Sequence, residues 1–432
     1  MHKNQVVPLR TMRQHPSICF IDLFAGCGGL SEGFVQAGYE PIAHVEMDKA
    51  ACNTLKTRAV YHWLREKRKL SLYRDYLNGD MSRDELYNLV PTDILNAVVH
   101  ATIGDATLSH IFKRIDGRLS ERSVDLVVGG PPCQAYSLIG RAKDENHMVG
   151  DSRNYLFKYY AKFLARYRPR AFVFENVLGL LSAKDESGIR YFDMMREAFA
   201  ALGYQTAYRV IDADCFGVPQ SRRRIILVGR SDVNVPWFPD LKPSPYAFTA
   251  RNMMSGLPPL RAGESSPPFR STGKPSQALL QTRVFDKSMP IAQHMARPHR
   301  KEDLEIYRLA VEMWGRHHRR MSYLDLPERL QSHQNRSSFL DRFKVVIPGR
   351  RCCHTVVAHI ARDGHYYIHP DAKQNRSLSI REAARFQTFP DNFYFEGTTE
   401  RSFRTAAFRQ IGNAVPVLLA YRIATQLKEI WR

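Results

Sequence analysis

Residues 129–134 read Gly-Gly-Pro-Pro-Cys-Gln and follow directly after the apolar run 124–128, Val-Asp-Leu-Val-Val. The run predicts a buried β-strand. The glycines of the loop permit close approach and uncommon backbone angles, whereas its two prolines fix their own φ and remove two amide donors, so the loop is bent and stiff. Open α/β folds bind their ligands at this end of a parallel strand. We therefore interpret Cys133 as a candidate nucleophile.

The same alternation of apolar runs and helical patterns extends over the first half of the chain. Strands are predicted at 18–24, 39–45, 124–128, 170–174, 204–211 and 224–228, and helices at 30–37, 154–167 and 189–202. We also expect one long basic helix over 48–77 and a further strand that ends at Asp105. Strands that alternate with helices imply right-handed crossovers, so the sequence predicts an α/β fold with a doubly wound, mainly parallel sheet.

The character of the chain changes after Gly229. Eight prolines interrupt residues 236–268, and no strand–helix rhythm survives there. Residues 297–351 carry 13 Lys and Arg against 7 Asp and Glu, a net charge of +6, and residues 359–370 are expected to form a β-hairpin. An apolar stripe after Pro416 predicts a C-terminal amphipathic helix that covers the first domain. We predict a first domain of residues 1–238, completed by 405–432, and a smaller irregular domain of residues 239–404.

The composition favours a polyanionic partner. Lys and Arg number 63 against 43 Asp and Glu, which gives a net charge of +20, although solubility alone is an alternative explanation. The seven cysteines include no Cys-x-x-Cys pair, so we expect reduced thiols and neither a disulfide framework nor a metal site. Because we find neither a signal peptide nor an apolar run of membrane-spanning length, we expect a cytoplasmic protein without a membrane partner.

The first glycine-rich loop in chain order, residues 25–29 (AGCGG), separates the first predicted strand from its helix, and the GGPPCQ loop is the second. Glu46 follows Gly26 by 20 residues, at the predicted tip of the second strand, where a carboxylate can accept both hydroxyls of a ribose. The loop lacks the G-x-G-x-x-G spacing that seats a pyrophosphate, because its last two glycines are adjacent. A nucleoside ligand without a pyrophosphate, such as S-adenosylmethionine, fits better. A purely structural glycine turn is the alternative.

Three chemically active groups are predicted to meet at the strand ends of one sheet. They are the thiol of Cys133, the carboxyl of Glu175 and the guanidinium groups of residues 222–224. A thiolate adds to an electron-poor carbon, a carboxyl can hydrogen-bond a ring nitrogen, and an arginine can hold a carbonyl oxygen on which negative charge develops. A pyrimidine ring suits all three groups. Because such a ring is inaccessible inside a duplex, the base would have to be flipped out.

Six motifs follow one another along the chain. They are residues 22–29 (DLFAGCGG), 129–134 (GGPPCQ), 175–177 (ENV), 220–224 (QSRRR), 381–390 (REAARFQTFP) and 410–416 (QIGNAVP). Together they resemble the DNA (cytosine-5) methyltransferase family of the bacterial restriction-modification type. The resemblance implies an α/β fold of the S-adenosylmethionine-dependent methyltransferase type. It also implies that the first domain is catalytic and binds the cofactor, and that the smaller domain holds a target-recognition region at about residues 239–375.

The resemblance also implies roles for individual residues. Cys133 would attack the cytosine ring, Glu175 would bind ring nitrogen 3, and Arg222 and Arg224 would orient the base and its neighbours. The residues that would bind S-adenosylmethionine are Phe24, Ala25, Gly26, Gly28, Gly29, Glu46, Met47, Asp105, Ala106, Pro131, Leu156, Asn413 and Val415. The implied function is methylation of carbon 5 of a flipped cytosine in a specific double-stranded DNA sequence, through a covalent Cys133 adduct. The enzyme would be a monomer that acts separately from a cognate restriction endonuclease.

Other functions stay open at this point. A related tRNA cytosine-5 methyltransferase shares the Pro-Pro-Cys loop, although the large basic region before Arg381 favours duplex DNA. A non-catalytic DNA-binding regulator is a second alternative, although every catalytic position is filled, and the glycine spacing disfavours an NAD-dependent oxidoreductase. The stretch from Glu46 to Asp105 is longer than compact members of the family need.

Overall fold

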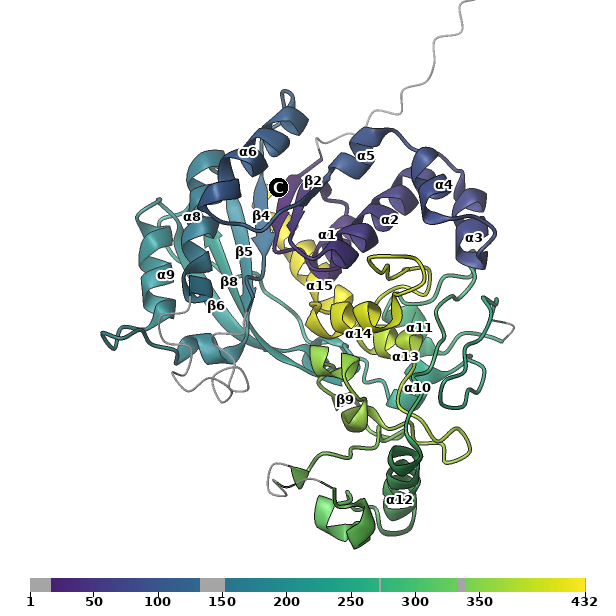
Figure 1. Cartoon of the computed structure of the whole chain (residues 1–432). Coiled ribbons are helices and arrows are strands. Elements are labelled where there is room, and N and C mark those ends of the chain that lie inside the picture. The colour runs from purple at the N-terminus through teal and green to yellow at the C-terminus, as the bar shows by residue number, and fades with distance from the viewer. Residues whose placement is uncertain (1–16, 133–151, 272, 333, 335–338, 432) are drawn as a thin grey trace, which may run out of the picture.

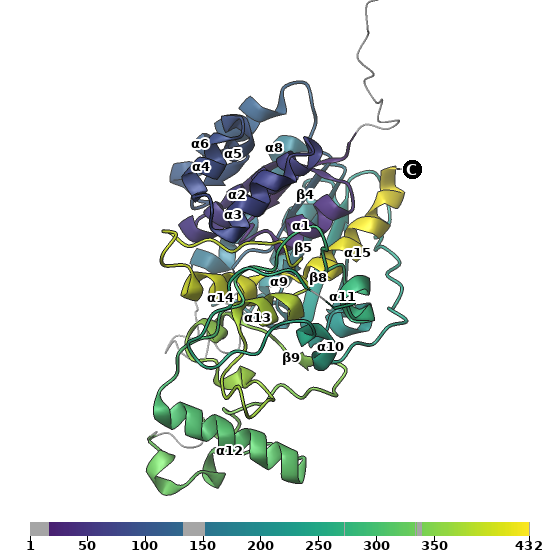
Figure 2. The ribbon, with the colours of Figure 1, turned by 90° about the vertical axis from the view of Figure 1, so that its right-hand side faces the viewer.

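The computed structural model describes residues 17–132, 152–271, 273–332, 334 and 339–431. It has a large α/β body and, at the bottom of Figure 1, a smaller projection around the helix α12 (Lys301–His317). Figure 2 shows from the side that α12 stands clear of the sheet. The candidate nucleophile Cys133 lies outside the described residues, so the strand-end loop is described only as far as Pro132.

The body is built on a seven-stranded sheet with the order β3, β2, β1, β4, β5, β8, β6. Neighbouring strands are parallel except at β8, which runs antiparallel to both β5 and β6. The strands are β1 (Cys19–Leu23), β2 (Glu40–Glu46), β3 (Val98–His100), β4 (Leu126–Gly129), β5 (Ala171–Asn176), β6 (Gln205–Asp212) and β8 (Arg223–Arg230). The predicted mainly parallel sheet is confirmed, and its strand order reverses between β1 and β4, where α/β folds bind ligands.

Helices cover both faces of the sheet, because its strands are apolar on both sides. In β4, Val127 joins the buried cluster that includes side chains of α8 and α9, whereas Leu126 and Val128 join the opposite cluster, with side chains of α1 and α15. The helices of the body include α1 (Gly29–Gln36), α6 (Asp105–Leu119), α8 (Leu156–Tyr167), α9 (Tyr191–Ala200) and α15 (Val417–Leu427). The doubly wound arrangement is therefore confirmed.

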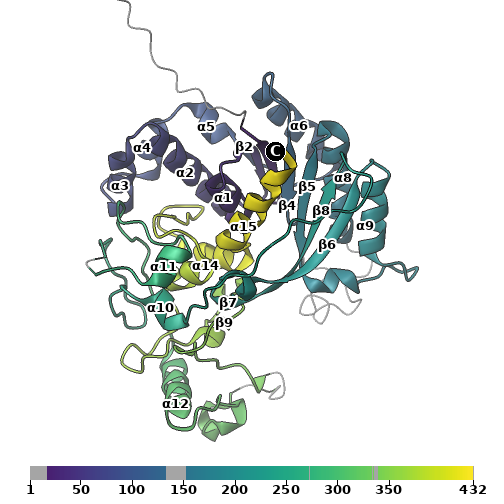
Figure 3. The ribbon, with the colours of Figure 1, turned by 180° about the vertical axis from the view of Figure 1, so that it is seen from behind.

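The C-terminal helix packs on the body, as its apolar stripe predicted. α15 follows Pro416 and contributes Leu419 and Ile423 to the buried cluster that contains Phe20 of β1. Figure 3 shows this helix beside α1, and the two are in extensive contact. A Cβ on Gly33 of α1 would lie 2.4 Å from the Cβ of Ala420, so the helices approach this closely only because residue 33 is glycine.

Two expectations between β2 and β4 are wrong. The long helix expected over 48–77 is two helices, α2 (Lys49–Glu66) and α3 (Leu70–Asn78), because the chain turns at Arg68, whose φ is 58°. The turn lets side chains of both helices enter one buried cluster. The third strand ends at His100, where its pairing with β2 stops, and Asp105 is instead the first residue of α6. Two short helices, α4 (Arg83–Asn88) and α5 (Thr92–Asn96), lie between α3 and β3.

The remaining segments contain short elements and long irregular stretches. The helices here, besides α12, are α10 (Ala250–Met254), α11 (Gln277–Gln281), α13 (Ile380–Phe386) and α14 (Arg404–Asn413). The strands β7 (Gln220–Ser221) and β9 (Cys353–His354) form a separate parallel pair. The division of the chain at residues 238 and 404 stays a prediction. Short 3-10 helices lie at Ser152–Tyr155, Leu178–Leu181, Ala213–Phe216, Tyr323–Asp325, Glu328–Leu330 and Lys428–Trp431.

The β-hairpin expected over residues 359–370 is wrong. Two 3-10 helices, Ala358–Ala361 and His365–Tyr367, occupy this stretch. Ile368 forms bridges with Val345 and Ser377 instead of with a neighbouring strand. The hairpin was expected because Asp363-Gly364 is a typical hairpin turn, and long-range pairing replaces it.

A fully buried ion pair holds α13 in place. Two nitrogens of Arg376 donate to the carboxylate of Glu382 over 2.6 and 2.8 Å, and both side chains are at most 2% exposed. Burial by itself would raise the pKa of Glu382, but the charge and hydrogen bonds of Arg376 outweigh it and lower that pKa well below its ordinary value. The stability that the pair contributes is therefore present above that ordinary value and is lost as the pH falls through the depressed pKa.

Replacing Glu382 with glutamine is expected to lower the free energy of unfolding by about 3–5 kcal/mol, because it leaves the Arg376 charge buried without a counter-charge. Glutamine still serves the capping box with Ser379, so the substitution isolates the loss of charge. Denaturant unfolding at neutral pH measures the difference. Glu305→Gln, which removes the partner of Arg329 in an exposed pair, is the control and should leave the midpoint unchanged. Equal stability of wild type and Glu382→Gln would contradict this expectation.

Candidate active site

The first glycine-rich loop connects β1 to α1 through left-handed backbone. Phe24, Gly26 and Gly28 have φ values of 56°, 54° and 86°. A Cβ at Gly28 would lie 2.7 Å from the side chain of Leu55, so close packing requires glycine there. At Gly26, by contrast, a Cβ would meet no atom within 4 Å. The loop is therefore closely packed at Gly28 and has open space beside Gly26, as a ligand-binding loop requires.

Glu46 lies beside this loop, at the end of β2. Its carboxylate accepts hydrogen bonds from the backbone N–H groups of Gly26 at 2.7 Å, Met47 at 2.9 Å and Asp48 at 2.8 Å. Burial raises the pKa of Glu46, and these three hydrogen bonds oppose the shift. The structure therefore brings Glu46 and the glycine loop together, as predicted. A carboxylate can accept about four hydrogen bonds, so room for a further donor remains.

The other predicted cofactor residues come from several elements. Asp105 and Ala106 begin α6 and are exposed, and Asp105 accepts hydrogen bonds from Tyr159 at 2.8 Å and Lys162 at 2.7 Å. Pro131 is buried and accepts from Asn176 at 3.3 Å. Met47 is 58% exposed. The remaining predicted residues are the buried Ala25 and Gly29, Leu156 at the start of α8, Asn413 at the exposed end of α14, and Val415.

One of the predicted cofactor residues, Val415, packs tightly against the first glycine-rich loop. The carbonyl oxygen of Val415 would lie only 2.4 Å from a Cβ at Gly29. The segment after α14 therefore packs directly on the start of α1, although the two are nearly 400 residues apart. This contact supports the predicted grouping of the QIGNAVP motif with the first glycine loop.

Glu175 and Arg224 face each other across β5 and β8. Nε of Arg224 lies 2.9 Å from Oε1 of Glu175, and the two side chains are only 14% and 12% exposed. Glu175 also lies against the second glycine-rich loop, because a Cβ on Gly130 would be 2.7 Å from its Oε2. A carboxyl and a guanidinium thus meet where the described part of the GGPPCQ loop ends. Such a pair can bind the polar edge of a planar ring.

Arg222 differs from Arg224 in its surroundings. Its side chain is 1% exposed, and Nη1 donates to the carbonyl oxygen of Val356 at 2.8 Å and of Gly412 at 3.5 Å. The guanidinium of Arg222 thus joins the backbone of two distant segments, whereas that of Arg224 pairs with Glu175. The role of Arg222 in orienting a cytosine stays a prediction.

Gln220 has a part in this region that its sequence motif did not indicate. Its side chain is fully buried, and its amide donates to the carbonyl oxygen of Phe386 and to Gln387, both at 2.8 Å. Its carbonyl oxygen accepts from the N–H of Val356 at 3.0 Å. Gln220 therefore links the start of the motif at residues 220–224 (QSRRR) to α13 and to the segment after β9. Only the position of Gln220 in a recognised motif could have singled it out in the sequence.

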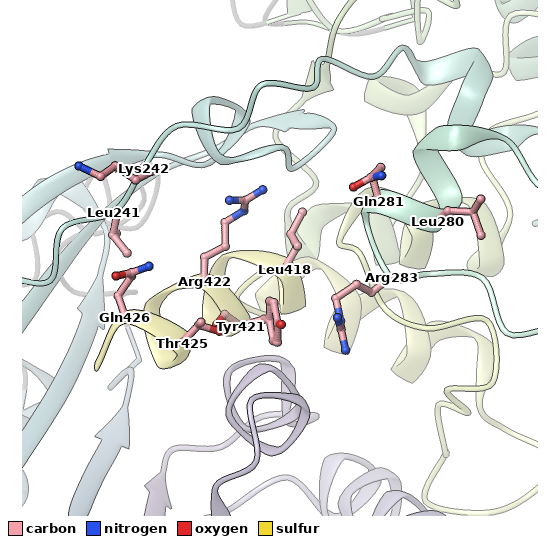
Figure 4. Close-up of a pocket in the computed structure, with 10 residues that line it drawn as sticks. All are labelled: Leu241, Lys242, Leu280, Gln281, Arg283, Leu418, Tyr421, Arg422, Thr425 and Gln426. Carbon is pink, nitrogen blue, oxygen red and sulfur yellow. Dashed lines mark hydrogen bonds between the residues drawn. The ribbon is translucent and has the colours of Figure 1, made fainter. Parts of the chain in front are cut away.

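A separate cavity of about 370 Å³ lies on the outer side of α15 (Figure 4). Leu241 and Lys242, the end of α11 with Arg283, and Leu418, Tyr421 and Arg422 of α15 line it. Among the predicted site residues that the structure describes, none lines this cavity. Within the described ranges, no group of three His, Cys, Asp or Glu side chains is arranged to hold a metal ion. No helix in that same part of the chain has the length and apolar character needed to cross a membrane.

The sheet order, with a glycine loop after β1 and an acid at the end of β2, fits an α/β fold of the methyltransferase type. The model of the family "C-5 cytosine-specific DNA methylase" matches residues 18–73 and 94–429, so the chain belongs to this family. The predicted family and fold class are thereby confirmed.

Individual relatives agree with this result. The chain is 40% identical to the Type II methyltransferase M.Bpa9945I of Bacillus paralicheniformis, over 95% of this chain and 98% of that protein. It is 30% identical to the Type II methyltransferase M.DdeI of Desulfomicrobium norvegicum, over 94% and 88%. Among solved structures, one described as a prophage DNA modification methyltransferase of E. coli matches with a TM-score of 0.58 and 21% identity, over 96% of this chain and 99% of that chain.

Proposed function

We propose that this protein is the modification methyltransferase of a restriction-modification system and methylates carbon 5 of cytosine in a specific double-stranded DNA sequence. The observation that carries the proposal is the family match over residues 18–73 and 94–429, which includes the GGPPCQ loop, Glu175 and Arg224. The Type II methyltransferases to which the chain is similar support the restriction-modification role. A cognate endonuclease that acts separately, a monomeric state and a cytoplasmic location are further parts of the proposal.

S-adenosylmethionine is the cofactor that the site residues fit. Glu46 can accept a further hydrogen bond at the end of β2, where a ribose hydroxyl would lie. The space above Gly26 leaves room for the rest of the nucleoside. When bound, the cofactor supplies an electrophilic methyl group. We assign its remaining contacts to the predicted residues of α6, α8 and the segment after α14.

The chain's own groups supply the remaining chemistry. In the proposed reaction the thiolate of Cys133 forms a bond to carbon 6 of the cytosine, and the electrons of the 5,6 double bond shift towards carbon 5. Glu175 hydrogen-bonds ring nitrogen 3 and Arg224 holds the ring carbonyl oxygen, so both groups stabilise the charge that develops. Carbon 5 would then form a bond to the methyl group of the cofactor, and the bond from that methyl group to sulfur would break, so that a neutral thioether leaves. Loss of the proton from the methylated carbon 5 to a base and expulsion of the Cys133 thiolate then restore the ring.

A base inside a duplex cannot reach these residues, so we propose that the enzyme flips the target cytosine out of the helix. The net charge of +20 supports binding of the DNA backbone. The projection around α12, with the basic residues of 297–351, is the part of the chain that we assign to target recognition.

Purified protein incubated with tritiated S-adenosylmethionine is expected to label duplex DNA and to leave tRNA unlabelled. Bisulfite sequencing of DNA from cells that express the protein should then show methylation at one short sequence. Heat-denatured protein is the control for non-enzymatic labelling. Label that appears only in tRNA would overturn the assignment of the substrate, and absence of label from both nucleic acids would overturn the proposed activity.

A further inference from the structure

Residues 74–93 are not covered by the family model, which matches 18–73 and resumes at 94. They include the end of α3 and all of α4. Their side chains reach a distant segment, residues 392–400, just before α14. The hydroxyl of Tyr73, directly before the uncovered stretch, donates to the carbonyl oxygen of Asn392 at 3.0 Å, and Arg83 donates to that of Gly397 at 3.1 Å. We call α3 and α4 the extra helices. Through these contacts they form a brace against residues 392–400, the segment that leads into α14.

The brace centres on Glu396, whose side chain is 2% exposed. Its Oε1 accepts hydrogen bonds from the hydroxyls of Tyr76 and Thr57, the latter at 2.6 Å, and Nη1 of Arg83 lies 3.6 Å from its Oε2. Burial raises the pKa of Glu396, against the effect of the Thr57 and Tyr76 hydrogen bonds and the Arg83 charge. A buried carboxyl with this many partners has one defined position.

From Glu396 a closed set of hydrogen bonds leads to α14. The N–H of Glu396 donates to Oγ1 of Thr54 at 2.8 Å, and this hydroxyl donates to Oε1 of Gln410 at 2.6 Å. The amide of Gln410 donates back to the carbonyl oxygen of Glu396 at 2.8 Å. The loop of three bonds joins α2, residue 396 and α14, and all of its side chains are buried.

α14 in turn touches the first glycine-rich loop. The thiol of Cys27 donates to the carbonyl oxygen of Gln410 at 3.6 Å. Three residues later α14 ends at Asn413, and Val415 then packs on Gly29. The place of Gln410 therefore sets how the end of α14 lies against the loop over which the cofactor is proposed to bind.

We propose that Tyr76, Glu396 and Gln410 are positioning residues for the cofactor site, through which the extra helices hold the end of α14 against the glycine loop. This inference rests on the proposed function. A purely structural brace would affect only stability. A positioning role requires in addition that weakening the brace lowers the affinity for S-adenosylmethionine, while the Cys133 loop and the Glu175–Arg224 pair are left unchanged.

Tyr76→Phe tests the inference, because it removes one hydroxyl and keeps the ring packed. We expect the Kd for S-adenosylmethionine, measured by calorimetry on the full chain, and the KM for this cofactor to rise by about threefold to tenfold, the equivalent of one hydrogen bond. The kcat at saturating cofactor should stay within about twofold of wild type, because the groups on the cytosine ring are untouched.

Tyr204→Phe is the matched control. Tyr204 is also a buried tyrosine, and its hydroxyl donates to the carbonyl oxygen of Pro169 at 2.8 Å, in a part of the body that contains none of the predicted cofactor residues. The Tyr204→Phe variant should lose stability as Tyr76→Phe does, but it should keep the wild-type Kd for S-adenosylmethionine. Equal Kd values for wild type and Tyr76→Phe, with a lowered Tm, would overturn the positioning role.

Two substitutions at Glu396 extend the test. Glu396→Gln keeps a carbonyl oxygen that can accept from Tyr76 and is expected to retain a Kd within about twofold of wild type. Glu396→Leu removes the acceptor and should raise the Kd at least as much as Tyr76→Phe. If the two variants had the same Kd, the inference would fail. A wild-type protein that binds no S-adenosylmethionine would instead overturn the proposed function itself.

Discussion

Replacing Cys133 with serine is expected to reduce methyl transfer on the order of 10⁴-fold or more, because a hydroxyl is a far poorer nucleophile at neutral pH and the proposed mechanism has no other group that forms the bond to carbon 6. The rate of tritium incorporation into duplex DNA measures the loss. A duplex with 5-fluorocytosine at the target position adds a direct readout. Wild type should be trapped on it as a covalent complex, because fluorine on carbon 5 cannot leave as a proton does.

Cys215→Ser is the matched control for this prediction. Cys215 is an exposed free thiol on a 3-10 helix after β6, and its substitution should preserve both the rate and the trapped complex. A Cys133→Ser protein that methylates DNA at the wild-type rate would show that the covalent mechanism is wrong. The result would not affect the family assignment, which rests on the match over residues 18–73 and 94–429.

The second large effect is expected at the Glu175–Arg224 pair. Glu175→Gln should lower kcat by about 10²–10⁴-fold, because an amide cannot exchange a proton with ring nitrogen 3 as a carboxyl does. Arg224→Ala should lower it by about 10²–10³-fold, through the loss of a donor to the carbonyl oxygen. Single-turnover rates with saturating cofactor and DNA separate these effects from binding.

The neighbouring Arg223 provides the control. Its side chain is 59% exposed and pairs with Asp212 at 2.9 Å, on the other side of the strand from the Glu175 pair. Arg223→Ala should therefore keep kcat. Because Glu175 and Arg224 are in contact, the double variant should lose less than the product of the two single losses. Full multiplicative loss would mean that the two groups act independently, contrary to the pairing in the structure.

The candidate residues of the site could be named from the sequence because they stand in local patterns. The apolar runs and the glycines, prolines and single charged residues that follow them predicted where strands end and which groups lie there. The sheet, its helices on both faces and the contact of Glu46 with the first glycine loop follow these predictions. Predictions from local patterns were wrong where one pattern is compatible with two backbone conformations, as at Arg68 and at Asp363-Gly364.

These failures have a common physical cause. A basic run can continue a helix or end it, and α2 ends because the side chains of α3 gain a place in the buried cluster on α2. An Asp-Gly pair permits a hairpin, but Ile368 pairs with Val345 and Ser377 instead. In both cases the free energy of packing against distant segments decides between local conformations that differ little in energy.

The sequence by itself therefore determined the class of fold and the family, and it named the residues to which we assign the chemistry, because strand periodicity and reactive side chains are properties of short stretches. Only the tertiary structure decided which of these residues meet. It paired Arg224 with Glu175 and buried Arg222 against Val356. It also joined Tyr76 to Glu396 across 320 residues of chain, and Glu396 in turn to Gln410. Contacts of this kind depend on how whole elements pack, and no local pattern encodes them.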